Sequence, residues 1–395
     1  MSTPGTTPIN LDKLKSTSTD RHSPVSGTVS GSPEPARSIA SLDGLRAFSI
    51  LTVIIAHSRW FFPSFITDNS LFAFVIGNGT HGVAVFFVIS GFLITSLLLK
   101  EFDKSGTVSL KHFYFRRTLR IFPPFYVLLI VMGLLWLFNV IPEDLRSFVA
   151  SATYTWAYFP WAHGYFIFHS WSLSIEEQFY LLWPLFFVTF HRRTTLLAAC
   201  LWIIAVMPCL RVLLYFAAPA LRGHEFYMVH GWIDTMMVGC VLALVRHQGH
   251  WQMSFRKYVN GWSAIVMAII AFYVNPLLQE SLPKTGAGIF LLGISPTLTA
   301  LCVGWVLIYL TETRNKVVYF VFNNRVIRHI GVLSYSLYLW QQLFMADRLH
   351  LLPYGFLFLI GAAECSHWLV ERPSFRLRAY LENLWWPRVR QTATP

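Results

Sequence analysis

Arg46 and His57 place a fixed cation and a titratable imidazole inside the first long apolar run of the chain, which extends from Leu42 to His57. In a helix, a separation of eleven residues returns to within about 20° of the starting direction and rises by about 16 Å. The two side chains therefore share one face. Ionisable groups within a membrane usually line sites or pathways. The pair predicts a polar groove in which Arg46 binds an anion and His57 accepts a proton or acts as a nucleophile.

Each of the two residues also has a purely structural explanation. Arg46 can extend to lipid headgroups, and His57 can hydrogen-bond to a neighbouring helix. Their alignment on one face favours a functional site over these alternatives.

Three further arginines form a short basic motif before two adjacent prolines. The spacing of Arg116, Arg117 and Arg120 clusters them around one turn of an amphipathic helix. Guanidinium groups bind phosphates through paired hydrogen bonds. The motif predicts a phosphate-binding site on the same side of the membrane as Arg46. The alternative is a basic cluster that only holds this loop in the cytoplasm.

Two carboxylates lie where another apolar stretch begins. Glu176 and Glu177 belong to the segment His169–Pro184, and Ser174 is predicted to cap the helix there. The helix dipole alone would favour acidic residues in a first turn. We nevertheless expect Glu176 to partner an imidazole or a sugar hydroxyl, with Tyr180 one turn below it. Glu177 is the weaker candidate on the same, acceptor side.

Ser90 and Gly91 form a pair of small residues at the centre of the second apolar stretch. Small residues allow another backbone, or a slender acyl chain, to approach closely. Such a pair more often marks helix packing than a ligand channel. Ser90 is kept as a candidate for binding a donor substrate.

The composition places these candidates in an integral membrane protein. The chain has 395 residues, of which 55% are hydrophobic and 13% are charged, whereas soluble domains carry about twice that charged fraction. Ten apolar stretches can span about 30 Å of hydrocarbon. They cover residues 43–61, 82–99, 121–141, 177–190, 195–217, 228–245, 261–279, 288–310, 329–346 and 351–370. A weaker stretch at 147–161 is too short and too rich in hydroxyl groups to cross, and we expect it to be interfacial or re-entrant.

The positions of the basic residues orient these stretches. With the N-terminus inside, the cytoplasmic loops and tail hold about four times as many lysine and arginine residues as the opposite side. Both termini are therefore predicted to be cytoplasmic. Contact with the anionic lipids of the inner leaflet explains the net charge of +12 without nucleic acid. The predicted fold class is an all-α, polytopic integral membrane protein with about ten transmembrane helices.

Three segments are predicted along the chain. Residues 1–38 are dominated by Ser, Thr, Pro and Gly and are expected to form a disordered cytoplasmic tail. Residues 39–373 form the membrane domain, and residues 374–395 form a short amphipathic tail on the inner surface. We expect no soluble domain beside it. The five cysteines show neither metal-ligand spacing nor a disulfide framework, so no metal site is predicted.

Several motifs, taken in order, resemble those of the acyltransferase family 3 membrane enzymes. They are Leu42–Ala47 with His57, Gly82–Ile94, Phe115–Pro123, Trp171–Tyr180, Leu333–Trp340 and Glu371–Pro373. The resemblance extends from about Ile39 to Pro373. It implies a ten-helix protein of the inner (plasma) membrane that takes an acyl group, commonly acetyl from cytosolic acetyl-CoA, to a hydroxyl of an extracytoplasmic acceptor. That acceptor is usually a cell-envelope glycan. Acyl-CoA is then a substrate, and no bound cofactor is expected.

By the same resemblance, Arg46 and His57 match the pair that the family requires for activity. Arg116, Arg117 and Arg120 match its basic motif, and Glu176 matches its acidic position. Two positions of this chain depart from the family. Gln341 stands where a histidine is often found, which excludes a catalytic imidazole there, and Ala84 stands where many members carry aspartate.

The residues and the resemblance together predict one mechanism. The CoA phosphates bind Arg46 and the basic motif, which places the thioester near the middle of the membrane. His57 is a general base or a transient acyl carrier, and Glu176 orients the imidazole or holds the sugar. Some family members append a soluble domain that handles the acceptor. In this chain we expect transfer to finish within the membrane domain or to involve an envelope-biosynthesis protein.

Two other classes of function fit the same residues. In a carrier or flippase, the intramembrane Arg46 and His57 bind an anionic or glycolipid substrate without covalent chemistry. The absence of matching halves in the sequence argues against this class. A catalytically silent sensor or scaffold is the third alternative, which the intact pair disfavours.

Overall fold

The computed structural model describes residues 41–63, 79–159, 164–247, 257–282, 285–313, 315–345, 349, 351 and 354–386. All regular structure within these ranges is helical, which confirms the all-α prediction. The longer helices are α1 (Leu42–His57), α4 (Gly79–Ser105), α5 (Leu110–Leu137), α7 (Ser170–Thr189), α8 (Arg193–Ala217), α9 (Val229–His247), α13 (Ala287–Glu312) and α15 (Arg325–Met345). The predicted tail of residues 1–38 lies outside the described residues.

Shorter helical segments connect or extend these helices. They are α6 (Leu145–Ala152), α11 (Gly261–Ile269), α12 (Asn275–Ser281), α14 (Lys316–Asn323), α16 (Gly355–Ser366), α17 (Arg372–Trp385) and the single turns η1 (Arg59–Phe61), η2 (Trp156–Tyr158), η3 (Pro219–Leu221) and η4 (His224–Tyr227). Two π-helical turns, η5 (Ile270–Val274) and η7 (His367–Glu371), join α11 to α12 and α16 to α17 without a break. The amphipathic segment predicted from residue 374 is therefore, as far as Trp385, the end of a longer helix.

Six helices of the described residues are long and apolar enough to cross a membrane: α4, α5, α8, α9, α13 and the continuous segment Gly261–Ser281. Each of the ten predicted stretches contains a helix. The other four do not meet the same measure. α1 has 16 residues, and polar or charged side chains lower the hydropathy of α7, of α15 and of the continuous helix from α16 to α17. The number ten and the orientation of the termini stay predictions.

The weaker stretch at 147–161 forms no spanning helix in its described part. α6 has eight residues, which is about 12 Å at the rise of an α-helix, and the short turn η2 follows it. Up to Phe159 the stretch contains no helix long enough to cross the membrane by itself, and that it is interfacial or re-entrant stays a prediction.

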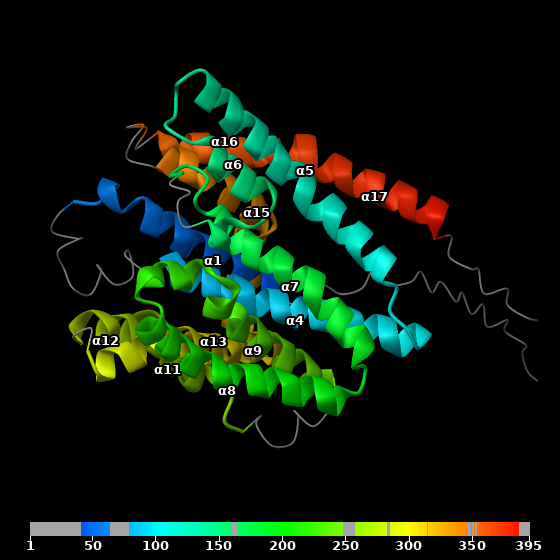
Figure 1. The fold of residues 1–395 in the computed structure, drawn as a ribbon. Coiled ribbons are helices and arrows are strands. Elements are labelled where there is room, and N and C mark those ends of the chain that lie inside the picture. Colours follow the sequence, from blue (N-terminus) through cyan, green and yellow to red (C-terminus); the bar gives the residue numbers. More distant parts are fainter. Residues whose placement is uncertain are drawn as a thin grey trace, which may run out of the picture. The chain divides into compact units, whose positions relative to one another are not determined.

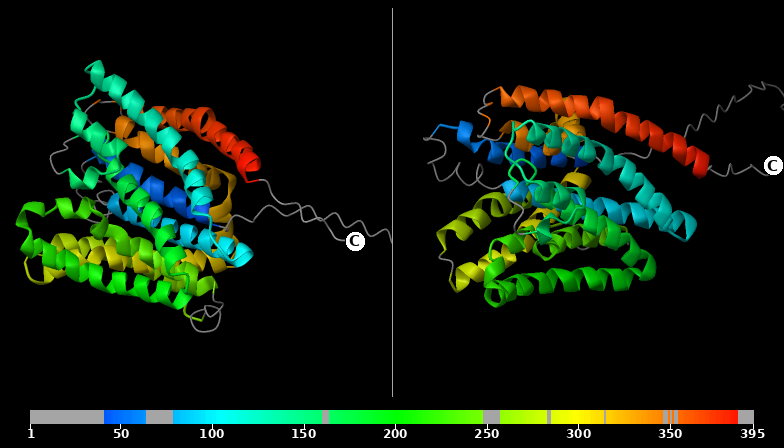
Figure 2. Two further views of the ribbon diagram at one scale, coloured as in Figure 1. Left: turned by 45° about the vertical axis from the view of Figure 1, so that its right-hand side comes forward. Right: turned by 45° about the horizontal axis from the view of Figure 1, so that its top comes forward.

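Within residues 41–386, the helices lie side by side in three groups. In Figure 1, α1, α4 and α7 lie between a first group of α8, α9, α11, α12 and α13 and a second group of α5, α15, α16 and α17. Both views of Figure 2 keep this order. Helices far apart in the sequence therefore meet around α1 and α4.

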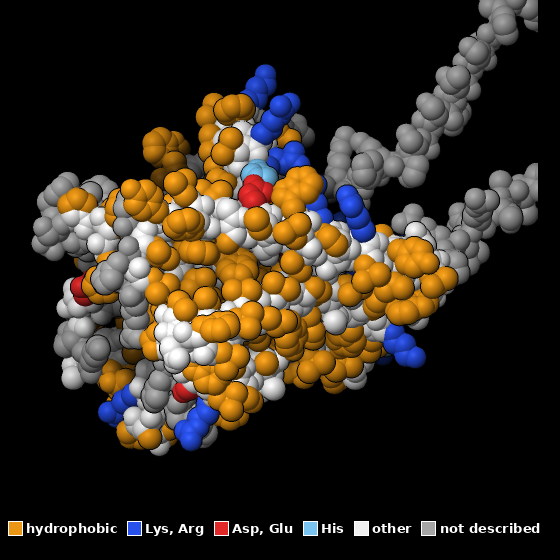
Figure 3. All heavy atoms as spheres, turned by 90° about the horizontal axis from the view of Figure 1, so that it is seen from above, with side chains coloured by type: hydrophobic (Ala, Val, Ile, Leu, Met, Phe, Trp, Pro, Cys, Tyr) orange, Lys and Arg blue, Asp and Glu red, His pale blue; other side chains and the backbone are white. Residues whose placement is uncertain are grey.

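The outer surface of the helices is largely apolar. Figure 3 shows hydrophobic side chains over most of one face, with lysine and arginine at its margins. Large side chains such as Leu137, Trp202 and Trp262 are 66%, 65% and 80% exposed. Exposed apolar area on this scale is unfavourable in water and favourable against lipid tails.

Glycines bring α4 and α9 into backbone contact. A Cβ added at Gly91 of α4 would lie 2.0 Å from the carbonyl oxygen of Met236, and one added at Gly239 of α9 would lie 2.1 Å from that of Val88. Gly91 is thus a packing residue, as the sequence favoured. Its neighbour Ser90 lies on another face of α4 and points to a cavity.

The contact at Gly91 gives a first prediction. A Gly91→Ala variant is expected to be destabilised by about 1–3 kcal/mol, because the added methyl group overlaps backbone that cannot move aside. Gly133→Ala is the matched control, since nothing lies within 4 Å of a Cβ at Gly133 and alanine favours the helix. Thermal unfolding in detergent measures both. Equal melting temperatures for the two variants would contradict this packing.

A buried ion pair fixes the first group of helices. Arg211 of α8 donates to both carboxylate oxygens of Asp234 of α9 at 3.0 and 2.8 Å, to the hydroxyl of Thr297 of α13 at 2.7 Å and to the carbonyl of Gly293 at 2.6 Å. The side chains of Arg211 and Asp234 are 2% and 0% exposed. Because its donors are occupied by protein acceptors, this arginine is structural.

Candidate active site

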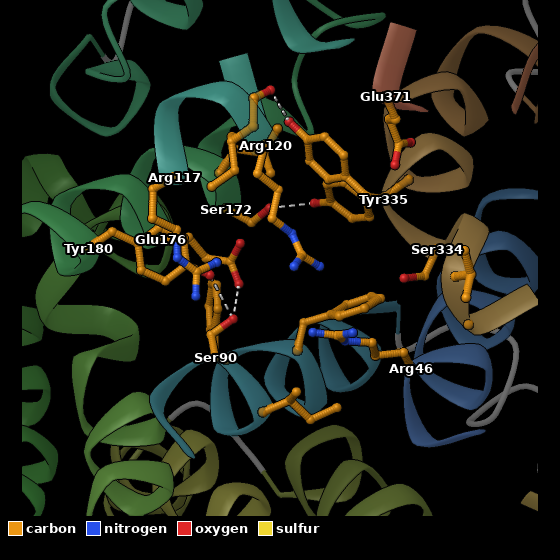
Figure 4. A pocket seen from close by; sticks show the side chains of 18 of the residues that line it. Arg46, Ser90, Arg117, Arg120, Ser172, Glu176, Tyr180, Ser334, Tyr335 and Glu371 are labelled. Carbon is orange, nitrogen blue, oxygen red and sulfur yellow. Dashed lines mark hydrogen bonds between the residues drawn. The ribbon is translucent and has the colours of Figure 1, made fainter. Parts of the chain in front are cut away.

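Helices α1, α4 and α7 and the second group of helices enclose a cavity of about 220 Å³. It is lined by α1, α4, α5, α7, α15 and the turn between α16 and α17 (Figure 4). The acidic, basic and histidine side chains that line it are Asp43, Arg46, Arg117, Arg120, Glu176, His367 and Glu371. Charges of both signs are thus gathered from four separate parts of the sequence.

Three guanidinium groups face this cavity. Arg46 of α1 is 23% exposed, and its only described ion pair is with Asp43 at 3.5 Å. Arg117 of α5 lies over the ring of Tyr180 at 4.7 Å, and Figure 4 shows the Arg120 side chain extending into the open space. Neither Arg117 nor Arg120 forms an ion pair with a carboxylate among the described residues. Their donors are therefore available to an anion such as a phosphate.

A chain of hydrogen bonds holds Glu176 on the same side of the cavity as Arg117 (Figure 4). The Tyr180 hydroxyl donates to Ser90 Oγ at 2.9 Å, and the Ser90 hydroxyl donates to Glu176 Oε1 at 2.7 Å. Glu176 and Tyr180 lie one turn apart on α7, as the sequence predicted, and Ser90 reaches them from α4 (Figure 4). The chain fixes the position of one carboxylate oxygen and leaves Glu176 Oε2 without a hydrogen bond from the described residues.

α15 supplies a wall that the sequence did not predict as part of the site. The hydroxyls of Tyr338 and Ser172 are hydrogen-bonded to each other, and Tyr335 donates to the carbonyl of Ile121 at 2.8 Å. Both tyrosines line the cavity. The motif Leu333–Trp340, one of those that resemble the family, could have indicated this wall, but it contains no charged residue.

Glu371 is the second carboxylate that sequence reasoning left without a role. It lies in the π-turn η7, accepts a hydrogen bond from Ser336 and lies 3.3 Å from His367 Nδ1. Its side chain is 6% exposed and faces the cavity (Figure 4). Its place in the motif Glu371–Pro373, which resembles the family, could have indicated Glu371 as a site residue.

Comparison with known proteins connects this geometry to a family. A family model described as an acyltransferase domain matches residues 39–364, and the matched region contains every described side chain of the cavity except His367, Glu371 and Phe375. The chain belongs to the acyltransferase family 3. No solved structure matches it significantly.

Bacterial relatives of this acyltransferase are named after O-acetyl transfer. The chain is 30% identical over 329 residues to a Staphylococcus aureus (strain COL) protein named "Putative O-acetyltransferase SACOL0978", with 77% of this chain and 50% of the relative covered. It is 26% identical over 331 residues to "Peptidoglycan O-acetyltransferase OatA" of Listeria monocytogenes, with 77% and 49% covered. The chain spans about half the length of the curated relatives it matches.

His57, the imidazole predicted for this acyltransferase, is not among the described residues that line the cavity. It ends α1, about 16 Å along the helix from Arg46, beside Gly79 at the start of α4. The ring nitrogen Nδ1 donates to the carbonyl of Val53 at 2.8 Å. A carbonyl only accepts, so Nδ1 carries the proton and Nε2 carries the lone pair.

His169 packs against Tyr338, a residue of the cavity wall, on the side of His57. It is 3% exposed, its ring packs edge-on against Tyr338 with centroids 5.5 Å apart, and it is close enough to His57 for their charges to interact. His57 thus lies beyond the end of the cavity where Tyr338 and Ser172 meet. In the sequence, His169 is the first residue of the segment His169–Pro184, and no function was predicted for it.

Two other predicted site residues lie away from the cavity of the acyltransferase. Arg116 is 48% exposed, and its Nε donates to Glu382 Oε1 of α17 at 2.6 Å. Partial burial alone would raise the pKa of Glu382, but the hydrogen bond and charge of Arg116, with Arg378 and His112, hold it below its ordinary value. Glu177, half-buried on the next face of α7, is not among the described lining residues.

The remaining predictions on this site concern single positions. Helix α7 begins at Ser170, so the prediction that Ser174 caps it is wrong. Ser174 is inside the helix and donates to the carbonyl of Ser170. Gln341, at the departure from the family, is fully buried. Among the described residues no group of three His, Cys, Asp or Glu side chains is placed to hold a metal ion, and the five cysteines are free.

Proposed function

We propose that this protein is a membrane O-acyltransferase that moves an acyl group, above all acetyl, from cytosolic acyl-CoA to a hydroxyl of an extracytoplasmic cell-envelope glycan. The observation that carries the proposal is the convergence of Arg46, Arg117 and Arg120 on one cavity that also holds Glu176. The family assignment supports acyl transfer, and the names of the relatives support O-acetylation of an envelope polymer.

The donor would enter from the side of Arg117 and Arg120. Acyl-CoA carries several phosphates on a nucleotide and a long, slender arm that ends in the thioester. Guanidinium groups without carboxylate partners bind phosphates well because they offer paired donors in a fixed plane. With the phosphates at α5 and at Arg46, the arm extends along α4 past Ser90, towards Ser172 and Tyr338 at the other end.

His57 is proposed to act at that other end as the general base. Its Nε2 takes the proton from the acceptor hydroxyl while the hydroxyl oxygen attacks the thioester carbonyl carbon. The carbon–sulfur bond breaks, and the departing thiolate receives the proton from His57, so CoA leaves as a thiol. In the alternative in which His57 carries the acyl group, Nε2 attacks the thioester carbonyl carbon and the CoA thiolate leaves first. The acceptor hydroxyl oxygen then attacks the acyl-imidazole, the bond to Nε2 breaks, and the hydroxyl proton goes to the CoA thiolate. Glu176 holds the acceptor or orients the reacting groups.

The proposed reaction goes with a location of each predicted segment relative to the membrane. The membrane domain of residues 39–373 carries the chemistry within the inner membrane, and the basic end of α5 with α17 faces the cytoplasmic leaflet. The tail of residues 1–38 is cytoplasmic. The acceptor is a polysaccharide, a lipopolysaccharide sugar or a glycolipid, brought by envelope-biosynthesis proteins.

A purified-protein assay tests the proposal against a carrier. The protein in detergent or nanodiscs is incubated with radiolabelled acetyl-CoA and with envelope glycan fragments. We expect free CoA to be released and label to appear on the glycan as an ester that mild alkali removes. Binding or movement of a substrate with no release of CoA above a protein-free control would favour the carrier and overturn the proposal.

A further inference from the structure

A second cavity, of about 240 Å³, lies on the other side of α4. It is formed where α4, α7 and α13 begin and where α12 ends, together with the turns that precede α9. The lysines of α4 and the basic residues of α9 are at the opposite ends of those helices, at Lys100, Lys104, Arg246 and His247. If those ends are cytoplasmic, as the basic residues predict, this cavity opens on the extracytoplasmic side.

Aromatic rings form one wall of the second cavity. The rings of Trp171 and Tyr227 lie 5.3 Å apart at their centroids, and those of Trp171 and Trp232 lie 5.9 Å apart. All three residues line the cavity. Such flat, weakly polar surfaces are suited to the carbon–hydrogen face of a sugar ring.

Amide and hydroxyl groups form the facing wall. Gln279 of α12 donates to the Ser295 hydroxyl at 2.6 Å, and Asn275 Nδ2 donates to the hydroxyls of Ser295 and Thr299 at 2.9 Å each. Asn275 is not among the described lining residues and supports this wall through Ser295 and Thr299; its Oδ1 is buried without a hydrogen-bond partner among the described residues. It lies directly after the π-turn η5, and π-turns are frequent at functional sites. Thr80, an exposed residue of the lining, adds another hydroxyl.

The charge of the two cavities differs sharply. Among the described residues, the second cavity is lined by one histidine, His81, and by no Asp, Glu, Lys or Arg side chain, whereas the first has three arginines, three carboxylates and His367. A phosphorylated ligand therefore fits the first cavity, and an uncharged ligand rich in hydroxyl groups fits the second.

The two cavities are separated by a thin wall. On α4, Val83 and Phe87 face the first cavity, and Thr80 and Ala84 face the second. The Phe87 ring packs edge-on against Trp171 and Trp232, at 6.4 and 5.6 Å. On α7, Ser172 faces the first cavity and Trp171 faces the second. A ligand in the second cavity would thus lie across α4 and α7 from the donor, at the end of α4 where His57 lies.

We propose that the second cavity is a binding site for a neutral sugar ring of the acceptor, held between the aromatic wall and the amide wall. Its assignment to the acceptor rests on the function proposed above, but the binding of a neutral sugar does not. Filling the site should weaken sugar binding and leave donor binding unchanged.

The test is direct binding of a β-linked disaccharide of N-acetylglucosamine to the purified protein, measured by saturation-transfer NMR. We expect binding to the unmodified protein and a dissociation constant raised at least tenfold in Thr80→Trp, whose indole fills part of the cavity. Gln279→Ala, which removes one amide from inside, should weaken binding in the same direction. Thr194→Trp is the matched control, because Thr194 is also exposed and also the second residue of a helix, α8.

The outcomes separate this inference from the proposed function. Loss of disaccharide binding in Thr80→Trp and Gln279→Ala, with Thr194→Trp unchanged, supports the site even if no CoA is released in the transfer assay. Equal binding to all variants, or none to the unmodified protein, overturns the site even if acyl transfer occurs. Thermal unfolding shows that each variant is folded.

Discussion

A His57→Gln variant is expected to transfer acyl groups about 10²–10⁴ times more slowly than the unmodified protein, the range associated with loss of a general base. The glutamine amide can still donate to the Val53 carbonyl, which His57 Nδ1 does at 2.8 Å, so the end of α1 should keep its structure. What the variant loses is a nitrogen that takes up a proton. Initial rates of CoA release with saturating glycan measure the effect.

His191→Gln is the control for this experiment. His191 is exposed at the end of α7, where its ring stacks on Phe102 with centroids 6.1 Å apart, and it lies in neither cavity. Its rate should be unchanged. If His57→Gln keeps a tenth or more of the activity, His57 is not the base, and the reacting end of the donor must lie within the first cavity, near Glu176.

An Arg120→Gln variant is expected to raise the KM for acetyl-CoA by about 10–100-fold. Charge-assisted hydrogen bonds contribute about 1.5–3 kcal/mol, and about 1.4 kcal/mol corresponds to tenfold in affinity. Arg120 has no carboxylate partner among the described residues, so its loss leaves no buried charge unpaired. The turnover number should change little, because the phosphates are far from the thioester. Steady-state kinetics with varied acetyl-CoA measures both quantities.

Arg116→Gln is a stringent control, because it removes the same charge from the same turn of α5. Arg116 binds Glu382 outside the cavity, and an exposed ion pair of this kind contributes only about 0–1 kcal/mol. Its KM should stay within about twofold. An equal rise in both variants would show that the motif acts through its overall charge, without direct phosphate contacts.

In the basic motif, the structure separates Arg116 from Arg117 and Arg120, which the sequence could not predict. The sequence placed Arg116, Arg117 and Arg120 around one turn and assigned phosphate binding to all three. Only the packing of α17 on α5 separates Arg116 from the other two, since α17 provides Glu382. A partner more than two hundred residues away along the chain leaves no trace in the spacing of the motif.

The Ser90–Gly91 pair gives a similar lesson. The sequence offered helix packing and ligand binding as alternatives. The structure has both, because adjacent residues of a helix point about 100° apart. Gly91 meets α9 and Ser90 meets Glu176, so one helix serves packing and the site at once.

Composition, periodicity and motif order determined the helical class, the helices that carry Arg46, His57 and Glu176, and the family. These are properties of local sequence and of transfer from water to lipid. The tertiary structure alone decided that Tyr335, Tyr338 and Glu371 complete the first cavity, that His57 lies beyond its end, and that a second, uncharged cavity exists. Cavities form between helices that are distant in the sequence. Their walls depend on how those helices rotate and pack against one another, and no single segment encodes that.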